Sequence, residues 1–236
     1  MDIAVLVGIY GAYPEYAKRV LGGIVEEQLP SDDSIQLHVA VSNGCRETIS
    51  YLRELFDGGS LDTLFESKAN INKDPMMRVL IDQVSTKYFL WIDDDSVLRP
   101  GWAAAMLSFV RRNNFFDGAG HVHSYARDDE YLKFLSKRPW FRREPRSSSV
   151  YFPTGGLFLA RTAFVRQQSF PDKGMIKKQD DLLFGDCIEQ VGGKLLDFSN
   201  DDQIMSRISI SCGARRGSGE EGFGNGWLDV NPTTGF

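Results

Sequence analysis

Alternating apolar runs and amphipathic segments constrain the fold of this chain more than any other feature of its sequence. Residues 3–9 are continuously apolar, as in a strand that is buried on both faces of a sheet. Residues 15–27 then carry apolar side chains at helical spacing. The alternation continues with strands predicted at 35–41, 63–67 and 88–92 and helices predicted at 46–56, 75–84 and 100–111. Strands and helices that alternate through short connections form a mostly parallel sheet flanked by helices, so the sequence predicts an α/β fold.

The second half of the chain is less regular. We expect strands at 118–125 and 194–198 and helices at 161–167 and 180–191. Residues 128–146 are polar, basic and aromatic, and we interpret them as a loop or a lid.

The length of 236 residues suits one large α/β domain with a short extension. We predict a domain over residues 1–210 and a flexible C-terminal segment over 211–236, because the start of that segment is rich in glycine. Arg215 and Arg216 lie within it, and the segment is a possible lid that closes over a bound diphosphate. A disordered tail is the alternative interpretation.

The charge and the cysteines exclude several classes of protein. A net charge of −5 argues against a basic surface that would bind nucleic acid over its whole extent. Cys45, Cys187 and Cys212 are far apart and lack CxxC spacing, so neither a zinc knuckle nor a disulfide framework is indicated. No segment resembles a signal peptide or reaches the about 20 apolar residues that span a bilayer. We therefore expect a cytoplasmic protein with no membrane span.

Three consecutive carboxylates, Asp93-Asp94-Asp95, follow the apolar run 88–92 directly. Open α/β sheets bind ligands at the carboxyl ends of their strands. Repulsion would raise the pKa values of these carboxyl groups unless a cation lies among them, and Mg²⁺ or Mn²⁺ prefers such oxygen ligands. Alternation along a strand lets Asp93 and Asp95 face one metal ion while Asp94 faces elsewhere. The alternative is a solvated acidic turn or a helix N-cap.

Residues 86–95 resemble the Asp-x-Asp segment of GT-A glycosyltransferases, most of all the family 2 enzymes and the β-1,4-N-acetylgalactosaminyltransferases of ganglioside synthesis. Three further blocks agree in order and spacing. They are residues 10–14, residues 155–161, and residues 180–184 followed by 191–194. The resemblance covers about residues 3–200 and implies a GT-A, Rossmann-like fold.

The resemblance also implies a reaction. A sugar would move from a nucleotide-diphosphate sugar, a UDP-sugar above all, to an acceptor hydroxyl with inversion. Asp93 and Asp95 would hold Mn²⁺ or Mg²⁺, Asp94 would contact the ribose or the sugar, and Asp181 would deprotonate the acceptor. For Asp180 and Asp181, the alternative is the first turn of a helix, where negative charge is favourable.

Further residues are candidates for contact with the nucleotide sugar: Ile9, Tyr10, Asn43, Arg78, Gly155, Gly156, Asp180, Arg215 and Arg216. Paired glycines let the backbone approach a sugar or a pyrophosphate closely, or they form an ordinary turn. Lys73 and Arg78 precede the metal-binding strand and can meet diphosphate charge, but a solvated helix face is the favoured interpretation of Lys73. Asn43 replaces the acidic residue of the family pattern, and Asp180 replaces its glutamate.

The segment 133–146 carries six cationic side chains and one acidic side chain. Within it, Trp140, Arg142 and Arg143 are candidates for binding the acceptor, which would be a glycan or another hydroxyl compound and could carry negative charge. A modified DNA base is a further acceptor to consider. A solvated loop with a buried tryptophan is the alternative. His121 and His123 are either ligands or ordinary satisfied histidines.

Two other functions compete with glycosyl transfer. A nucleotidyltransferase would carry a glycine-rich loop with cations after the first strand, but residues 10–14 contain no cation. A non-catalytic module that binds carbohydrate or nucleic acid would not need the acidic triplet or the Asp180-Asp181 pair.

Overall fold

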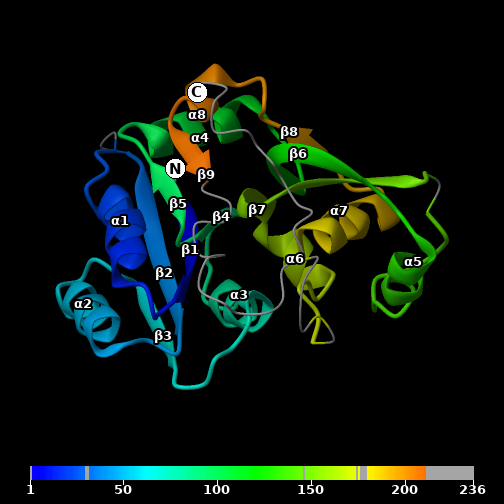
Figure 1. Ribbon diagram of the computed structural model, residues 1–236. Helices are drawn as coiled ribbons and strands as arrows, with labels where there is room; N and C mark the ends of the chain where they lie inside the picture. The colour runs from blue at the N-terminus through cyan, green and yellow to red at the C-terminus, as the bar shows by residue number, and fades with distance from the viewer. Residues whose placement is uncertain (1, 30–31, 146, 174, 176–179, 211–236) are drawn as a thin grey trace, which may run out of the picture.

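The computed structural model describes residues 2–29, 32–145, 147–173, 175 and 180–210. A seven-stranded sheet runs through it in the order β3-β2-β1-β4-β7-β6-β8 (Figure 1). Its strands are β1 (Asp2–Tyr10), β2 (Ser34–Ser42), β3 (Thr63–Ser67), β4 (Tyr88–Asp93), β6 (Gly118–Ala126), β7 (Ser149–Arg161) and β8 (Leu195–Asp197). Strands β1 to β4 are parallel, β7 is antiparallel to both β4 and β6, and β6 is parallel to β8. The predicted α/β class with a mostly parallel sheet is confirmed.

Helices cover both faces of this sheet. One core contains side chains of α1 (Pro14–Val25), α2 (Arg46–Asp57), α4 (Trp102–Arg112) and α8 (Asp202–Met205). The other contains side chains of α3 (Lys73–Ile81), α5 (Asp129–Leu135), α6 (Thr162–Gln167) and α7 (Asp180–Gln190). Strand β1 shows the reason for its continuous apolar sequence: Val5 and Val7 belong to the first core, and Ala4 and Leu6 belong to the second.

The chain changes direction across the sheet between β1 and β4. From β1 the strand order runs through β2 to β3 on one side, whereas β4 lies on the other side. The carboxyl ends of β1 and β4 therefore form a topological switch point, where open α/β sheets bind ligands. Asp94 closes this junction, because its buried carboxylate accepts a hydrogen bond of 2.9 Å from the Tyr10 backbone N–H.

The interpretation of residues 128–146 as a loop or a lid is wrong for their first part, which forms α5. The Asp128 carboxylate caps this helix by accepting from Tyr131 N–H at 2.7 Å. Tyr131 and Leu135, four residues apart, are buried in the second core. The sequence analysis also missed three very short elements: β5 (Ser96–Leu98), α8 and β9 (Ile208–Ile210), with β5 and β9 pairing in a second, two-stranded sheet.

A bulge and a glycine contact set the geometry of the second half. Gly120 pairs with Phe158 and Val122 with Pro153, so the single residue between them opposes residues 154–157. Helix α7 packs on β7 through Gly185, where a Cβ atom would lie 2.2 Å from the Tyr151 carbonyl oxygen. Only glycine permits this approach.

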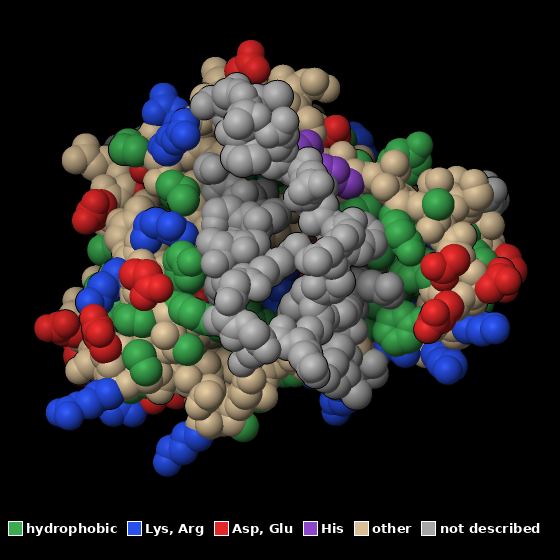
Figure 2. All heavy atoms as spheres, in the orientation of Figure 1, with side chains coloured by type: hydrophobic (Ala, Val, Ile, Leu, Met, Phe, Trp, Pro, Cys, Tyr) green, Lys and Arg blue, Asp and Glu red, His purple; other side chains and the backbone are tan. Residues whose placement is uncertain are grey.

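Acidic and basic side chains are interspersed over the solvated faces of α1 and α2 (Figure 2). Lys18 on α1 pairs with Glu47 on α2 at 2.7 Å, for example. In the part of the chain described, no helix combines the length and apolar character that are needed to cross a membrane. The predicted C-terminal segment, residues 211–236, lies outside the described residues.

Candidate active site

Asp93 and Asp95 lie at the carboxyl end of β4, and both are half-buried, whereas Asp94 between them is fully buried. The indole N–H of Trp91 donates to Asp93 Oδ1 at 2.7 Å and holds this carboxylate in place. Burial, with the negative charge of Asp93, raises the pKa of Asp95 to about 7. A divalent cation between the two carboxyl groups would stabilise their ionised forms.

The donor set distinguishes among metals. Within the described ranges, no three His, Cys, Asp or Glu side chains are arranged to hold a metal ion. Asp93 and Asp95 supply two carboxylates, which suits an ion that takes one or two protein ligands and completes its shell with substrate phosphates and water. A structural zinc ion requires four nitrogen or sulfur ligands. The residues therefore fit Mg²⁺ or Mn²⁺.

Lys73, the first residue of α3, lies among the acidic side chains. Its Nζ atom is 3.4 Å from Asp93 Oδ1 and 2.9 Å from Asp180 Oδ2, and it donates to the Gly155 carbonyl. Burial alone would lower the pKa of Lys73, but the charges of Asp180 and Asp93 outweigh it and raise the pKa above its usual value. The interpretation of Lys73 as part of a solvated helix face is therefore wrong.

Asp180 and Asp181 begin α7 and reach the same place from the other side. The Asp181 carboxylate lies against Gly155, where a Cβ atom would be 3.2 Å from Oδ2, and it accepts from Leu182 N–H at 2.9 Å. Burial, with the charge of Asp180, raises the pKa of Asp181 to about 7. A carboxyl group with a pKa near neutrality is matched to accepting a proton from a hydroxyl.

The sequence analysis missed Asp74, which lies next to Lys73 on α3. Asp74 is 3% exposed, and burial together with the charge of Asp180 raises its pKa to about 7. Five carboxyl groups thus lie within electrostatic range of one lysine. They belong to Asp74, Asp93, Asp95, Asp180 and Asp181. Pro75 could have indicated this position, because proline is common in the first turn of a helix. A helix that starts two residues before Pro75 places Lys73 and Asp74 at the carboxyl edge of the sheet.

Several other predicted residues lie around this cluster. Tyr10 is half-buried at the end of β1, and Asn43 is exposed at the end of β2 with a φ of 50°. The Gly156 carbonyl accepts from Ser96 Oγ at 3.3 Å. The bulge in β7 brings Gly155 and Gly156 here, so the paired glycines lie in a strand rather than in an ordinary turn.

Two residues predicted to contact the nucleotide sugar, Ile9 and Asp94, have buried side chains. The side chain of Ile9 is fully buried in the first core, so this residue can offer a ligand only its backbone. Asp94 is also fully buried, and its carboxylate accepts a hydrogen bond from the Tyr10 N–H. Asp94 therefore holds the end of β1 in place, and its contact with ribose or sugar stays a prediction.

The basic segment lies away from the cluster, and Arg78 borders the cluster only on the side of Asp74. Arg78 donates to the Asp172 carbonyl at 2.9 Å and lines a separate cavity beside residues 169–173. Trp140 is 2% exposed in the second core, which leaves it little surface for an acceptor. Backbone N–H groups of Arg142 and Arg143 donate to Gln190 Oε1 at 3.0 and 3.1 Å, at the far end of α7 from Asp181.

His121 and His123 form a pair beside the bulge, with ring centroids 4.4 Å apart. Burial and the neighbouring His121 lower the pKa of His123. Arg215 and Arg216 lie outside the described residues.

No known family model matches this chain, and no curated protein sequence matches it. Solved structures do resemble it. TarS 1–349 of S. aureus in complex with UDP has a TM-score of 0.60 at 14% identity, over 85% of this chain and 58% of that chain. The mannosyltransferase PcManGT from Pyrobaculum calidifontis, in complex with GDP-Man and Mn²⁺, has a TM-score of 0.59 at 15% identity, over 83% of this chain and 54% of that chain. TarS 1–349 in complex with UDP-GlcNAc gives 0.57 at 15% identity, over 85% and 56%.

The chain therefore spans little more than half the length of these structures. At such low identity the likeness establishes the fold alone. This chain has a GT-A-like α/β fold.

Proposed function

We propose that this protein is a metal-dependent glycosyltransferase that moves a sugar from a nucleotide-diphosphate sugar to an acceptor hydroxyl with inversion. The observation that supports it most is the convergence of two acidic groups at the switch point of a GT-A-like sheet. Asp93 and Asp95 arrive from β4, and the Asp180-Asp181 pair arrives from α7, with Lys73 between Asp93 and Asp180.

Asp93 and Asp95 are proposed to hold Mn²⁺ or Mg²⁺, which when bound neutralises the charge that develops on the departing diphosphate. Lys73 keeps Asp93 and Asp180 at fixed separation through its two ion pairs. Its contact with the Gly155 carbonyl also fixes the bulge of β7. The chain thus positions the donor from three elements that are far apart in sequence.

Asp181 is the proposed general base. It accepts the proton of the acceptor hydroxyl while that oxygen forms its bond to the anomeric carbon and the diphosphate leaves from the opposite side. Its pKa of about 7 keeps a large fraction of the group ionised at neutral pH. The close fit of Gly155 against its carboxylate leaves the base a restricted position.

A UDP-sugar is the favoured donor, because TarS, one of the similar structures, was solved with UDP and with UDP-GlcNAc. The GDP-Man complex of PcManGT keeps a GDP-sugar as the other donor to test. Tyr10, Asn43, Gly155 and Gly156 border the cluster and are the proposed contacts for the donor. The acceptor is proposed to be a glycan or another hydroxyl compound.

A donor screen tests this function. The full chain is incubated with individual nucleotide sugars, with Mn²⁺ or with a chelator, and without added acceptor. Slow metal-dependent release of nucleoside diphosphate from one donor is expected, since water can replace the acceptor. Release of pyrophosphate from a nucleoside triphosphate and a sugar phosphate would instead indicate a nucleotidyltransferase. A failure to bind any nucleotide in the presence of metal would favour a non-catalytic module.

A matched variant separates the cluster from general charge effects. Glu47→Gln removes one surface carboxylate that pairs with Lys18 on the solvated faces of α1 and α2. This variant is expected to retain the release rate. A loss equal to that of Asp95→Asn would show that the metal dependence does not arise at the proposed site.

A further inference from the structure

A second site lies at the opposite edge of the sheet from the carboxylate cluster. It is a pocket of about 440 Å³, within the range of small-molecule sites. The pocket lies near the start of β4, because Arg161 in its wall is the strand partner of Tyr88, the first residue of β4. The carboxylate cluster lies at the other end of the same strand, where Asp93 is the last residue. Gln190, which ends α7, also lines it, and α7 begins at Asp180. A helix of this length places its two ends about 15 Å apart, so the sites are separate.

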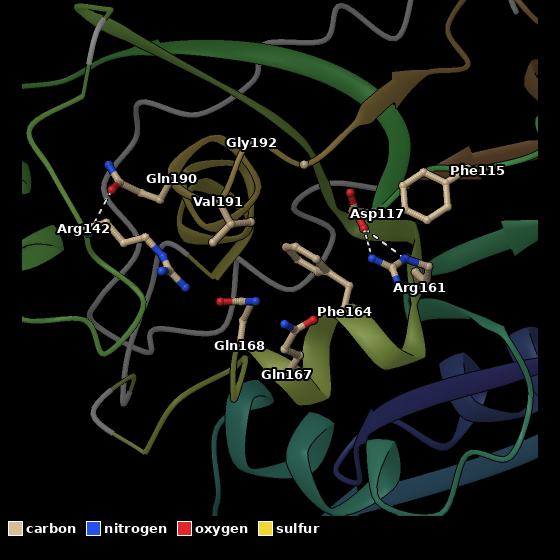
Figure 3. A pocket seen from close by; sticks show the side chains of 11 residues that line it. Phe115, Asp117, Arg142, Arg161, Phe164, Gln167, Gln168, Gln190, Val191 and Gly192 are labelled. Carbon is tan, nitrogen blue, oxygen red and sulfur yellow. Dashed lines mark hydrogen bonds and ion pairs between the residues drawn. The ribbon is translucent and has the colours of Figure 1, made fainter.

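The pocket carries an excess of one positive charge. The Arg161 guanidinium is balanced by Asp117, to whose Oδ1 its Nε–H donates at 2.9 Å. Arg142 extends its guanidinium toward the pocket (Figure 3), and among the described residues no acidic side chain forms an ion pair with it. Hydrogen bonds between its backbone and Gln190 fix its place. A guanidinium presents a planar set of donors that matches a carboxylate.

A second polar side chain points into the same space (Figure 3). Gln168 is 9% exposed, its side chain faces the pocket (Figure 3), and no described residue forms a hydrogen bond with its amide. Gln167 adds a second, exposed amide at the pocket wall. An amide offers two donor hydrogens and an acceptor oxygen, so a ligand with hydroxyl groups satisfies it better than a phosphate, which only accepts at its ionised oxygens.

An aromatic ring borders this polar lining. Phe115 is 51% exposed, and the Arg161 guanidinium carbon lies 4.7 Å from the centroid of its ring. The ring offers apolar surface that the C–H face of a sugar can cover. The pocket thus combines a guanidinium without an acidic partner among the described residues, two amide side chains and an apolar face.

We propose that this pocket binds an anionic sugar, a ring that bears hydroxyl groups and one carboxylate. The carboxylate pairs with Arg142, and the hydroxyls bond to Gln168 and Gln167. The site goes beyond the proposed glycosyl transfer and does not depend on it, because it shares no residue with the carboxylate cluster. It provides a place where an acidic saccharide is held away from the transfer site.

The test is a calorimetric or NMR titration of the full chain with sodium glucuronate, methyl glucoside and glucose 6-phosphate. Glucuronate is expected to bind at least about tenfold more tightly than the uncharged methyl glucoside, since a hydrogen bond to a charged group has this effect on affinity, and more tightly than glucose 6-phosphate. Arg142→Gln and Gln168→Leu should each weaken glucuronate binding by about tenfold or more. Arg143→Gln is the matched control, because Arg143 is exposed but does not line the pocket, and it should retain the affinity.

Equal binding of glucuronate and methyl glucoside, no glucuronate binding, or an unchanged affinity in Arg142→Gln would overturn the proposal. Tighter binding of glucose 6-phosphate would overturn it in favour of a phosphate site. Thermal unfolding of each variant identifies a loss that arises from misfolding, and the exposed Arg142 keeps the test valid if Gln168→Leu does not fold. Asp95→Asn should bind glucuronate as the unaltered protein does, even if no transfer activity is ever found.

Discussion

The two ends of helix α7 lie in opposite electrostatic environments. Its amino end begins with Asp180 and Asp181 and meets Lys73, whose surroundings hold more carboxyl groups than cations. Its carboxyl end meets the backbone of Arg142, whose guanidinium adds positive charge to a pocket where Arg161 and Asp117 balance each other. Both arrangements complement the helix dipole, which favours anions at the amino end and cations at the carboxyl end.

The difference shows how one rigid element can carry two binding preferences. The acidic end has an excess of negative charge and raised carboxyl pKa values, so it favours a cation and a group that gives up a proton. The other end has a guanidinium and two amide side chains that no described acidic residue balances, so it favours an anion with hydroxyl groups. If the two ends are independent, changes at the acidic end should leave ligand binding at the other end unaffected.

Asp95→Asn is expected to abolish metal-dependent donor binding. The substitution removes one of the two carboxylates that we propose hold the ion, and an amide oxygen carries no charge to replace it. Titration of the nucleotide with Mn²⁺ and with chelator measures the effect. Donor binding that stays metal-dependent in this variant would remove Asp95 from the metal site.

Asp181→Asn is expected to lower kcat by about 10²- to 10⁴-fold, the usual contribution of a general base, while donor binding stays unchanged. The variant keeps the size of the side chain but cannot accept the proton. Single-turnover kinetics and donor titration separate the two quantities. Normal turnover would exclude Asp181 as the base.

Lys73→Met is expected to reduce the free energy of unfolding by about 3 kcal/mol, because it leaves buried carboxylates without their cation. A carboxyl group whose folded pKa is raised costs stability when it is ionised, so the loss should be largest above pH 7 and should shrink toward pH 5. Denaturant unfolding at the two pH values measures this. The exposed substitution Lys18→Met is the control and should leave the stability nearly unchanged at either pH.

Gly185→Ala is expected to cost about 1–3 kcal/mol, because the added methyl group would overlap the Tyr151 carbonyl and force α7 away from β7. The shift should also displace Asp181 and lower kcat more than it raises KM. Gly22→Ala on α1 is the matched control, since open space surrounds that position. An unchanged kcat in Gly185→Ala would mean that α7 adjusts without moving its first turn.

The pH dependence should differ between the two ends. Asp181 acts in its ionised form, and its pKa is raised to about 7, so kcat/KM should fall as pH drops through about 7, by about tenfold per unit below it. Glucuronate binding should stay level between about pH 6 and 8, because arginine keeps its charge and a sugar carboxylate is ionised throughout. Parallel profiles at both ends would contradict their independence.

The sequence could predict the parallel half of the fold and the position of the acidic triplet. Residues 3–9 and 88–92 read as buried strands because they are continuously apolar, and carboxylates directly after such a strand must lie at the edge of the sheet. These features depend on local spacing. The fold class was confirmed by the strand order.

The remaining parts depend on contacts between distant segments. Asp94 is buried because its carboxylate accepts a hydrogen bond from a backbone N–H of β1 that is 84 residues away. Lys73 is withdrawn from most of the solvent only because α7 and the β7 bulge close around it, and the spacing of α3 indicates neither partner. Gln168 and Arg142 line one pocket from separate segments, so their spacing in the sequence carried no signal for that site.

The hydrogen bond from the Tyr10 backbone to the Asp94 carboxylate has a consequence for how nucleotide and metal affect each other's affinity. It joins the loop that follows β1 to the short segment that bears Asp93 and Asp95, so these parts move as one piece. A nucleotide that binds next to Tyr10 would orient the two carboxylates. A metal ion between those carboxylates would in turn reduce the mobility of the loop. Each ligand should therefore increase the affinity for the other by the same factor, which makes nucleotide and metal binding thermodynamically cooperative.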